Sequence, residues 1–184
     1  MIPVHIDPNS VRIGLIGRGA LAVRRLAWLR SGGCEPILWS DDPCTELVDA
    51  AGEALIPAMP QVDALGACHM IWIADLPLGE AEALAKAARA RRVLVNVEDI
   101  LDLCDFHTPA VQRRGALTLS AGTKGLSPAV AGAARRRLAE AFPEVWSAAL
   151  DEIGAAREAL RTQGASAAQV IADAHRRLAD HGIG

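Results

Sequence analysis

The sequence predicts an α/β fold, with a parallel sheet and crossover helices in the first half of the chain and a largely helical second half. Three observations predict it. Short apolar runs alternate with Ala- and Leu-rich stretches up to residue 97, which is typical of a parallel sheet. A glycine-containing turn at residues 17–19 joins the first apolar run to a stretch with helical spacing. Beyond residue 127 the chain is Ala-, Leu- and Arg-rich, with breaks only near 142–143 and 164–166.

The expected strands and helices of the first half follow one another in βα order. Apolar runs predict strands at residues 11–16, 36–39, 54–56, 69–74 and 93–97. Helical spacing of apolar residues predicts helices at residues 20–30, 44–51 and 78–91. A further strand is expected at 116–119, followed by a helix that begins at Pro128 with Ser127 as its N-cap, because proline suits the first helical position and a serine hydroxyl accepts from a free helical N–H.

Composition excludes several function classes. The net charge of −3 argues against nucleic acid as the main partner. No apolar run approaches the roughly 20 residues needed to cross a bilayer, and the first ten residues lack the pattern of a secretory signal, so we expect no membrane association and a cytoplasmic protein. The four cysteines form no C-x-x-C pair and the five histidines no metal-binding spacing. We therefore expect reduced thiols and no resident metal.

The turn at residues 17–22 reads G-x-G-x-x-A between a strand and a helix. In that context the first glycine permits the turn, the second lets a pyrophosphate approach the backbone, and the helical N–H groups meet its charge. The alternative is a tight strand-to-helix turn that binds nothing. Asp41 and Asp42 follow the second strand, where an acidic residue accepts hydrogen bonds from the adenosine ribose and disfavours the 2′-phosphate of NADP. They could equally cap the next helix. The residues expected to bind NAD are Gly17, Gly19, Ala20, Leu21, Ser40, Asp41, Asp42 and Ala74.

Three later segments are more distinctive: V-N-V-E-D at residues 95–99, C-D-F-H-T-P-A at 104–110 and G-T-K-G-L-S-P at 122–128. They resemble the precorrin-2 dehydrogenase family found in siroheme synthases, whose members typically read V-N-V-V-D, C-D-F-x-x-P-A and S-T-G-G-x-S-P. Order and spacing agree from about residue 3 to residue 142.

The resemblance implies a homodimer with an NAD-binding Rossmann domain, a dimerisation segment and a C-terminal helical domain, which we place at residues 1–113, 114–143 and 144–184. It implies NAD-dependent oxidation of precorrin-2 to sirohydrochlorin, on the way to siroheme or cobalamin. Some members also insert Fe²⁺ or Co²⁺ as a substrate ion, and for this chain that activity stays open. The family's functional aspartate falls on Asp99, and a modifiable Ser or Thr falls on Thr123.

Residue chemistry supports the same role for Asp99. Oxidation of a reduced tetrapyrrole transfers a hydride and releases a proton, so a base must lie near the nicotinamide. Asp99 follows the fifth strand, at the edge where ligands of doubly wound sheets bind. The alternative is an aspartate that caps a turn. If Glu98 faces the same cavity, like-charge repulsion raises the pKa of Asp99. The substrate carries many carboxylates, and the residues expected to bind it are Arg24, Arg113, Thr123, Lys124 and Arg135.

The chain departs from the family pattern at four positions. Residues 73–77 read I-A-D-L-P where A-A-T-D-D is usual, Lys124 and Gly132 replace a glycine and an arginine, and Glu98 replaces an apolar residue. Two other readings stay open. One is a different NAD-linked oxidoreductase, against which the V-N-V-E-D and Ser-Pro segments speak. The other is a degenerate module that carries a tetrapyrrole or a metal without catalysis.

Overall fold

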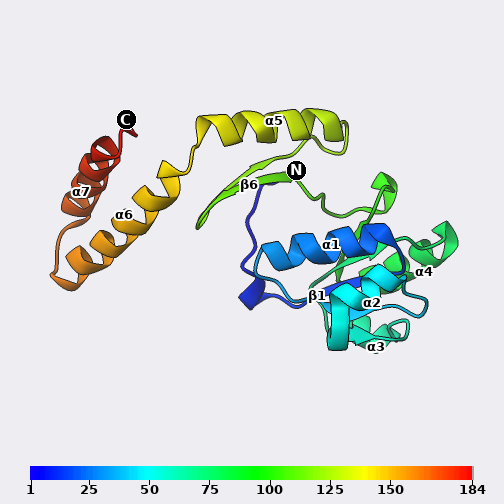
Figure 1. Cartoon of the computed structure of the whole chain (residues 1–184). Coiled ribbons are helices and arrows are strands. Elements are labelled where there is room, and N and C mark those ends of the chain that lie inside the picture. Colours follow the sequence, from blue (N-terminus) through cyan, green and yellow to red (C-terminus); the bar gives the residue numbers. More distant parts are fainter. Residues whose placement is uncertain (184) are drawn as a thin grey trace. The chain divides into compact units, whose positions relative to one another are not determined.

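The computed structural model of the chain describes residues 1–183. They form two compact units, Met1–His107 and a second that begins at Thr108 (Figure 1).

The first unit is built on a five-stranded parallel sheet. Its strand order is β3-β2-β1-β4-β5, so the order reverses between β1 and β4. The strands are β1 (Ile13–Gly17), β2 (Ile37–Trp39), β3 (Leu55–Ile56), β4 (Met70–Ala74) and β5 (Leu94–Val97). The α-helices are α1 (Ala20–Ser31), α2 (Thr45–Ala51), α3 (Val62–Gly66) and α4 (Leu78–Ala90), with 3₁₀ turns at Pro8–Ser10, Gly52–Ala54 and Leu101–Leu103. The predicted α/β class and all five predicted strands are confirmed; the short helix α3 was not predicted.

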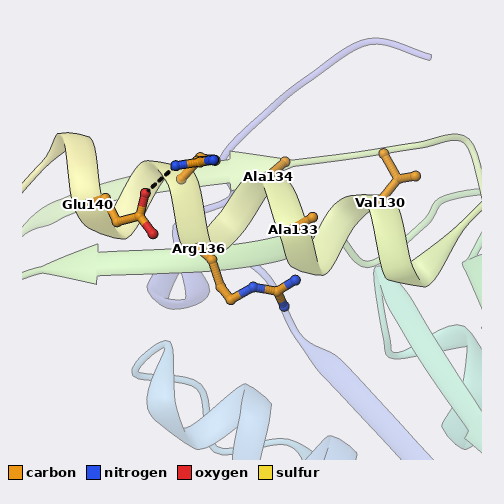
Figure 2. A pocket seen from close by; sticks show the side chains of 6 residues that line it. Val130, Ala133, Ala134, Arg136 and Glu140 are labelled. Carbon is orange, nitrogen blue, oxygen red and sulfur yellow. Dashed lines mark hydrogen bonds and ion pairs between the residues drawn. The ribbon is translucent and has the colours of Figure 1, made fainter.

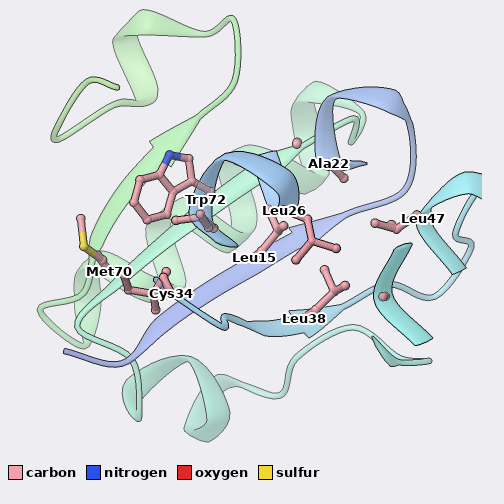
Figure 3. Packing of buried hydrophobic residues seen from close by; sticks show 12 residues of the cluster. Leu15, Ala22, Leu26, Cys34, Leu38, Leu47, Met70 and Trp72 are labelled. Atoms are coloured by element: carbon pink, nitrogen blue, oxygen red, sulfur yellow. The ribbon is translucent and has the colours of Figure 1, made fainter. Parts of the chain in front are cut away.

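Helices cover both faces of this sheet. On one face, buried residues of α1 and α2 pack against alternate residues of β1, β2 and β4, among them Leu15, Leu38 and Trp72 (Figure 3). On the other face, α3 and α4 pack against the intervening residues, among them Ile16 and Ile73. Strands buried on both faces read as continuous apolar runs, which is why β1 and β4 could be recognised in the sequence.

The second unit contains a β-hairpin and three helices. Strands β6 (Ala110–Arg114) and β7 (Leu117–Ala121) pair antiparallel. Helix α5 (Pro128–Ala141) packs on both strands, and α6 (Val145–Thr162) packs on α7 (Ala167–Asp180). The predicted cap is confirmed, since the Ser127 hydroxyl accepts a hydrogen bond from the Val130 N–H. Strand β6 was not predicted.

The two units differ in how much they bury. The first contains two extensive clusters of buried apolar residues. Within the described part of the second unit, Ala131 and Ala149 are the buried hydrophobic residues. No helix among residues 1–183 is both long and apolar enough to span a membrane. The four cysteines are free thiols, as expected.

Candidate active site

The turn between β1 and α1 depends on close packing. Gly17 ends β1 and lies opposite Ala74 of β4, and Gly19 is the N-cap of α1. A Cβ atom at position 17 would lie 2.7 Å from the Ala22 Cβ and 2.7 Å from the Ala74 carbonyl oxygen. Glycine is therefore required there, and it lets α1 begin directly against the sheet. The N–H groups of that first helical turn have no partner within the helix, which is the property an anion site uses.

A carboxylate of the protein itself occupies part of the space beside the free N–H groups of α1. Asp75 follows β4, and its Oδ2 accepts a hydrogen bond from the Ala22 N–H at 3.0 Å. A Cβ atom at Gly19 would lie 3.0 Å from the Asp75 Cγ and Oδ2. Asp75 has φ of 54°, in the left-handed region that aspartate tolerates better than most residues. The I-A-D-L-P segment thus changes the surroundings of the glycine turn, as its departure from the family pattern indicated.

Arg18, between the two glycines, binds the first aspartate of the predicted ribose pair. Its Nε and Nη2 atoms donate to Asp41 Oδ1 and Oδ2 at 2.8 and 3.0 Å, and Nη2 also donates to Glu80 Oε2 at 2.8 Å. The Asp41 hydrogen bond raises the pKa of Arg18, and the Arg18 guanidinium lowers the pKa of Asp41. The predicted ribose acceptor is therefore already paired with a cation.

Ser40 and Asp42, the other residues predicted to lie near the adenosine ribose, differ in burial. Ser40 is fully buried, and its Oγ is the buried side-chain N or O atom without a hydrogen-bond partner among residues 1–183. Asp42 is exposed. Neither aspartate caps α2, because the N-cap is Cys44, which makes no side-chain capping bond. The alternative reading of the pair as a helix cap was wrong. Instead, the Cys44 N–H donates to the Arg18 carbonyl at 2.6 Å and joins this loop to the glycine turn.

The backbone of this site suits a dinucleotide, whereas one of its side chains opposes binding. The glycine turn, the orphaned Ser40 hydroxyl and a shallow hollow lined by Ala20, Val23, Cys44 and Glu46 suit an adenosine diphosphate group. The carboxylate of Asp75, in contrast, takes the Ala22 N–H group that a pyrophosphate oxygen would use. The residues fit NAD once that carboxylate moves away.

Asp99 lies at the same edge of the sheet. β5 is parallel to β4, and β4 to β1, so the residues that follow these three strands meet at the carboxyl edge. Asp99 comes two residues after the end of β5, is exposed, and has φ of 62°. The described part of the chain provides its carboxylate with no hydrogen-bond or ion-pair partner. Asp99 is thus accessible to a ligand at this edge.

Glu98 does not share the surroundings of Asp99. Its carboxylate forms a buried ion pair with Arg25 of α1, and the two side chains are 10% and 8% exposed. The Arg25 guanidinium lies 4.9 Å from the ring centroid of Trp28 and 5.8 Å from that of Trp72. Burial lowers the pKa of Arg25, and the charge of Glu98 opposes that change. Because its charge is balanced by Arg25, Glu98 does not supply the like-charge repulsion suggested for Asp99.

Comparison with known proteins identifies the family. Residues 4–110 match a family model described as putative NAD(P)-binding. Over 132 residues the chain is 30% identical to a precorrin-2 dehydrogenase of Bacillus subtilis, covering 70% of this chain and 80% of that protein. The chain belongs to the precorrin-2 dehydrogenase family.

Other members of the family are longer. A siroheme synthase of Nitrosococcus oceani is 26% identical over 148 residues, which cover 79% of this chain and 32% of that protein. A siroheme synthase of Methylococcus capsulatus is 30% identical over 146 residues, or 77% and 31% of the two chains. The chain thus spans about a third of the siroheme synthases that it matches. The solved structure titled SirC, precorrin-2 dehydrogenase, superposes with a TM-score of 0.73 at 19% identity, covering 96% of this chain and 88% of that chain, and it shows the shared fold.

The family's C-D-F motif has a structural role in this chain. The Asp105 N–H donates to the Val95 carbonyl at 2.7 Å, and Asp105 Oδ2 accepts from the Val95 N–H at 2.9 Å, so the segment pairs with the edge strand β5. Phe106 packs edge-on against Trp72 with ring centroids 4.8 Å apart, and its carbonyl accepts from Asn96 Nδ2 at 2.8 Å. The motif that marks the family therefore fixes the loop that carries Asp99.

Cys104 holds the two ends of that loop together. Its Sγ lies 3.2 Å from the Val97 carbonyl oxygen, 3.3 Å from the Ile100 carbonyl oxygen and 3.3 Å from the Val97 nitrogen. Burial raises the pKa of the thiol, so it stays protonated and can donate to one of the two carbonyls.

The residues predicted to bind substrate are divided between the two units. Arg24 is exposed on α1 in the first unit. In the second unit Arg113 is half-buried on β6, while Lys124 and Arg135 are exposed. The Thr123 hydroxyl lies 3.2 Å from the Ser127 carbonyl and 3.4 Å from its N–H, so it orders the turn before α5.

Sequence reasoning missed three contributors to the site: Glu80 at the start of α4, Arg25 beneath Glu98, and Cys104 in the Asp99 loop. Arg18 pairs with Glu80 over 62 positions, and Arg25 with Glu98 over 73. No local pattern signals such pairs. For Cys104 a signal existed, since it belongs to the C-D-F motif, but the sequence around a thiol gives no indication of which carbonyl it contacts.

Proposed function

We propose that the chain catalyses the NAD-dependent oxidation of precorrin-2 to sirohydrochlorin. The observation that carries the proposal is the unpartnered Asp99 carboxylate at the same sheet edge as the glycine turn. The Bacillus subtilis relative, named precorrin-2 dehydrogenase, supports the choice of substrate. The product is an intermediate for siroheme or cobalamin.

Each group in the site has a distinct task in this reaction. Bound NAD supplies the acceptor for the hydride. The turn formed by Gly17, Gly19, Ala20 and Leu21 would hold its pyrophosphate through backbone N–H groups, beside Ala74. Ser40, Asp41 and Asp42 would face the adenosine ribose, and the negative charge of the two aspartates favours NAD over NADP. Asp99 would accept the proton that leaves the macrocycle, because it is an accessible carboxylate without a competing partner.

The polycarboxylate substrate requires cations. We propose Arg24, Arg113, Lys124 and Arg135 as its binding residues, with Thr123 shaping the turn beside Lys124. Guanidinium and ammonium groups bind carboxylates through charge-assisted hydrogen bonds. The Lys124 φ of 54° places a lysine in the conformation that suits the glycine usual at that position.

An anaerobic assay tests the proposal. Precorrin-2 is incubated with the protein, with and without NAD, and the formation of sirohydrochlorin and NADH is followed by absorbance. We expect equal amounts of both products, dependent on protein and on NAD. Failure of the protein to accelerate the oxidation, under conditions where NAD is shown to bind, would reject the proposed activity. Adding Fe²⁺ or Co²⁺ to the product tests metal insertion in the same samples.

A non-catalytic tetrapyrrole- or metal-carrying module is the second candidate, and one observation favours it. Asp75 occupies part of the pyrophosphate position. A carrier binds sirohydrochlorin without binding NAD, so titration of each ligand separately distinguishes the two functions.

We also propose a homodimer, with residues 114–143 as the dimerisation segment between a dinucleotide domain (1–113) and a helical domain (144–184). The hairpin β6–β7 forms a separate two-stranded sheet on which α5 packs, and this small assembly buries little apolar surface. Exposed apolar side chains such as Leu126 and Val130 lie in the same segment. The free thiols suit a reducing compartment, and we propose the cytoplasm.

A further inference from the structure

The carboxylate of Asp75 lies where a dinucleotide-binding turn normally receives an anion. Its Oδ2 accepts from the Ala22 N–H in the first turn of α1, at 3.0 Å, and the same oxygen lies 3.0 Å from the position of a Cβ on Gly19. Close approach of the pyrophosphate to the second glycine is the reason that this glycine exists in the motif. Asp75 and a pyrophosphate therefore require the same space and the same donor.

The surrounding charge makes the competition stronger. Asp41, Asp75 and Glu80 lie around the turn, and the cation that contacts this group, Arg18, is already bound to Asp41 and Glu80. A pyrophosphate would add two negative charges to a position where carboxylates already outnumber the arginine. These carboxylates do not make a cation site either, because the described residues contain no group of three His, Cys, Asp or Glu placed to hold a metal.

We propose that Asp75 weakens the binding of NAD. Its carboxylate caps α1 in the cofactor-free protein, and the side chain must move away before NAD binds. A carboxylate at a helix N-terminus is stabilising, so the cofactor-free state is favoured and NAD must displace it. Asp75 is exposed, which allows its side chain to leave the helix without unfolding the sheet. This inference rests on the proposed use of NAD.

Two substitutions separate charge from shape. Asp75→Asn keeps the size, the hydrogen-bond acceptor and the tolerance for positive φ, but removes the charge. Asp75→Gly removes the side chain and also tolerates positive φ. The matched control is Asp49→Asn, the same chemical change at an exposed position of α2. Calorimetry measures the Kd of NAD, ADP and adenosine for each protein, and thermal unfolding without ligand measures the Tm.

If Asp75 competes with the pyrophosphate, its removal changes the affinity for phosphate-containing ligands alone. We expect both Asp75 variants to bind NAD and ADP at least about tenfold more tightly than the wild type, since one opposing charge near a phosphate is worth on the order of a tenfold change. Adenosine affinity stays unchanged because adenosine has no phosphate. The Tm of Asp75→Gly falls without ligand, since the cap is lost. A merely structural role would lower stability and affinity together.

Other outcomes overturn the inference. Equal NAD affinity in the wild type, both variants and Asp49→Asn would show that Asp75 does not compete, while the proposed function would stand. Weaker NAD binding in the Asp75 variants would make Asp75 a ligand of the cofactor and reverse the inference. Absence of NAD binding in all four proteins would reject both the inference and the proposed cofactor. Binding by the variants but not by the wild type would support the inference and favour the carrier function for the natural chain.

Discussion

At the scale of single residues, the carboxylates of the loops around the sheet differ in whether they are paired. Asp41 binds Arg18, Glu98 binds Arg25, and Asp105 binds Arg89. Asp75 accepts from a helical N–H. Asp99 differs from these four, because within residues 1–183 its carboxylate has no such partner. An unpaired carboxylate is available to a ligand, whereas an arginine-bound one already has a partner within the protein.

Substitution of Asp99 tests its role as a base. Asp99→Asn preserves shape and tolerance for positive φ but cannot accept a proton. We expect turnover of precorrin-2 to fall about a hundred- to ten-thousandfold, or about 3 to 5 kcal/mol of transition-state stabilisation. The Kd of NAD and the Tm should stay close to those of the wild type. Asp102→Asn, an exposed neighbour in the Leu101–Leu103 turn, is the control, and near wild-type turnover in Asp99→Asn would assign Asp99 to the turn alone.

Asp41 allows a test of cofactor choice. In the wild type we expect tighter binding of NAD than of NADP, since the 2′-phosphate would meet Asp41 and an arginine already paired with it. Asp41→Asn removes one of the two carboxylates that bind Arg18 and leaves the bond to Glu80, and an arginine near the ribose accommodates the 2′-phosphate. NADP affinity should then rise about tenfold relative to NAD. Calorimetry with both nucleotides measures this ratio, with Asp49→Asn as the control; a wild type that binds NADP as tightly as NAD would contradict the expected preference.

At the scale of elements, β5 is an edge strand that is completed by the chain that follows it. The C-D-F segment pairs with Val95 through both backbone groups of that residue, and the Arg89–Asp105 ion pair joins the segment to α4. The loop from Glu98 to Leu103 is therefore held at both ends. The position of Asp99 depends on these contacts, although none of them touches its carboxylate.

Removal of the Cys104 thiol tests this dependence. In Cys104→Ala, the Val97 and Ile100 carbonyls lose their contacts with Sγ. We expect the free energy of unfolding to fall by about 1 kcal/mol, a drop in Tm of roughly 2 to 4 °C, together with slower turnover at unchanged NAD affinity. Cys104→Ser retains a donor at the same position and should recover most of both losses. Equal turnover in the alanine variant and the wild type would show that the loop is ordered without the thiol.

We expect the contact between α6 and α7 to weaken at acid pH. Glu152 of α6 binds His181 and Arg177, and these bonds lower its pKa; Arg177 likewise lowers the pKa of Asp173. A carboxyl whose pKa is lower in the folded state stabilises that state above its ordinary pKa of about 4, and the effect is lost as pH falls through the folded value.

Hydrogen exchange provides the measurement. At pH 7 the amides of α7 should exchange faster in Glu152→Gln than in the wild type, and the difference should diminish as the pH falls below about 4 and through the lowered pKa of Glu152 in the folded protein. Because the groups are exposed, we expect a modest difference. Glu158→Gln, on the same helix without a side-chain partner in the described structure, should exchange like the wild type at every pH. A difference that persisted unchanged at pH 3 would rule out the ion pairs as its cause.

At the scale of the whole molecule, the two units bury very different amounts of apolar surface. The first has a sheet covered on both faces. The second exposes Leu126, Val130, Leu150 and Ile171. Its helix α5 presents a shallow hollow lined by Val130, Ala133, Ala134, Arg136, Arg137 and Glu140, of which Arg137 pairs with Glu140 (Figure 2). A unit with so little core gains stability when a second copy covers part of its surface.

A homodimer is therefore expected in solution. Light scattering at micromolar concentration should return twice the chain mass of 19.4 kDa, and the Tm should rise with protein concentration, because association stabilises the folded state by mass action. A mass of 19.4 kDa at these concentrations, with a Tm independent of concentration, would contradict the dimer.

Local chemistry let the sequence by itself determine most of the first unit and the start of α5 in the second. The apolar runs of β1 and β4, the G-x-G turn and the Ser127 cap all follow from interactions within a few residues of the chain. The segment motifs were enough to find the family. Strand β6 was missed because its residues A-V-Q-R-R are half-buried without apolar alternation, and its partner β7 decides its conformation.

The tertiary structure alone decided which charges meet. Asp75 reaches Ala22 over 53 positions, Arg25 reaches Glu98 over 73, and Arg18 gathers Asp41 and Glu80. Each of these contacts joins elements that the parallel sheet brings to one edge through crossover helices. The sequence placed candidate residues at that edge. Side-chain packing between elements distant in the chain then decides whether a carboxylate there stays free, as Asp99 does, or is bound by a neighbour. Spacing along the chain carries no record of that packing.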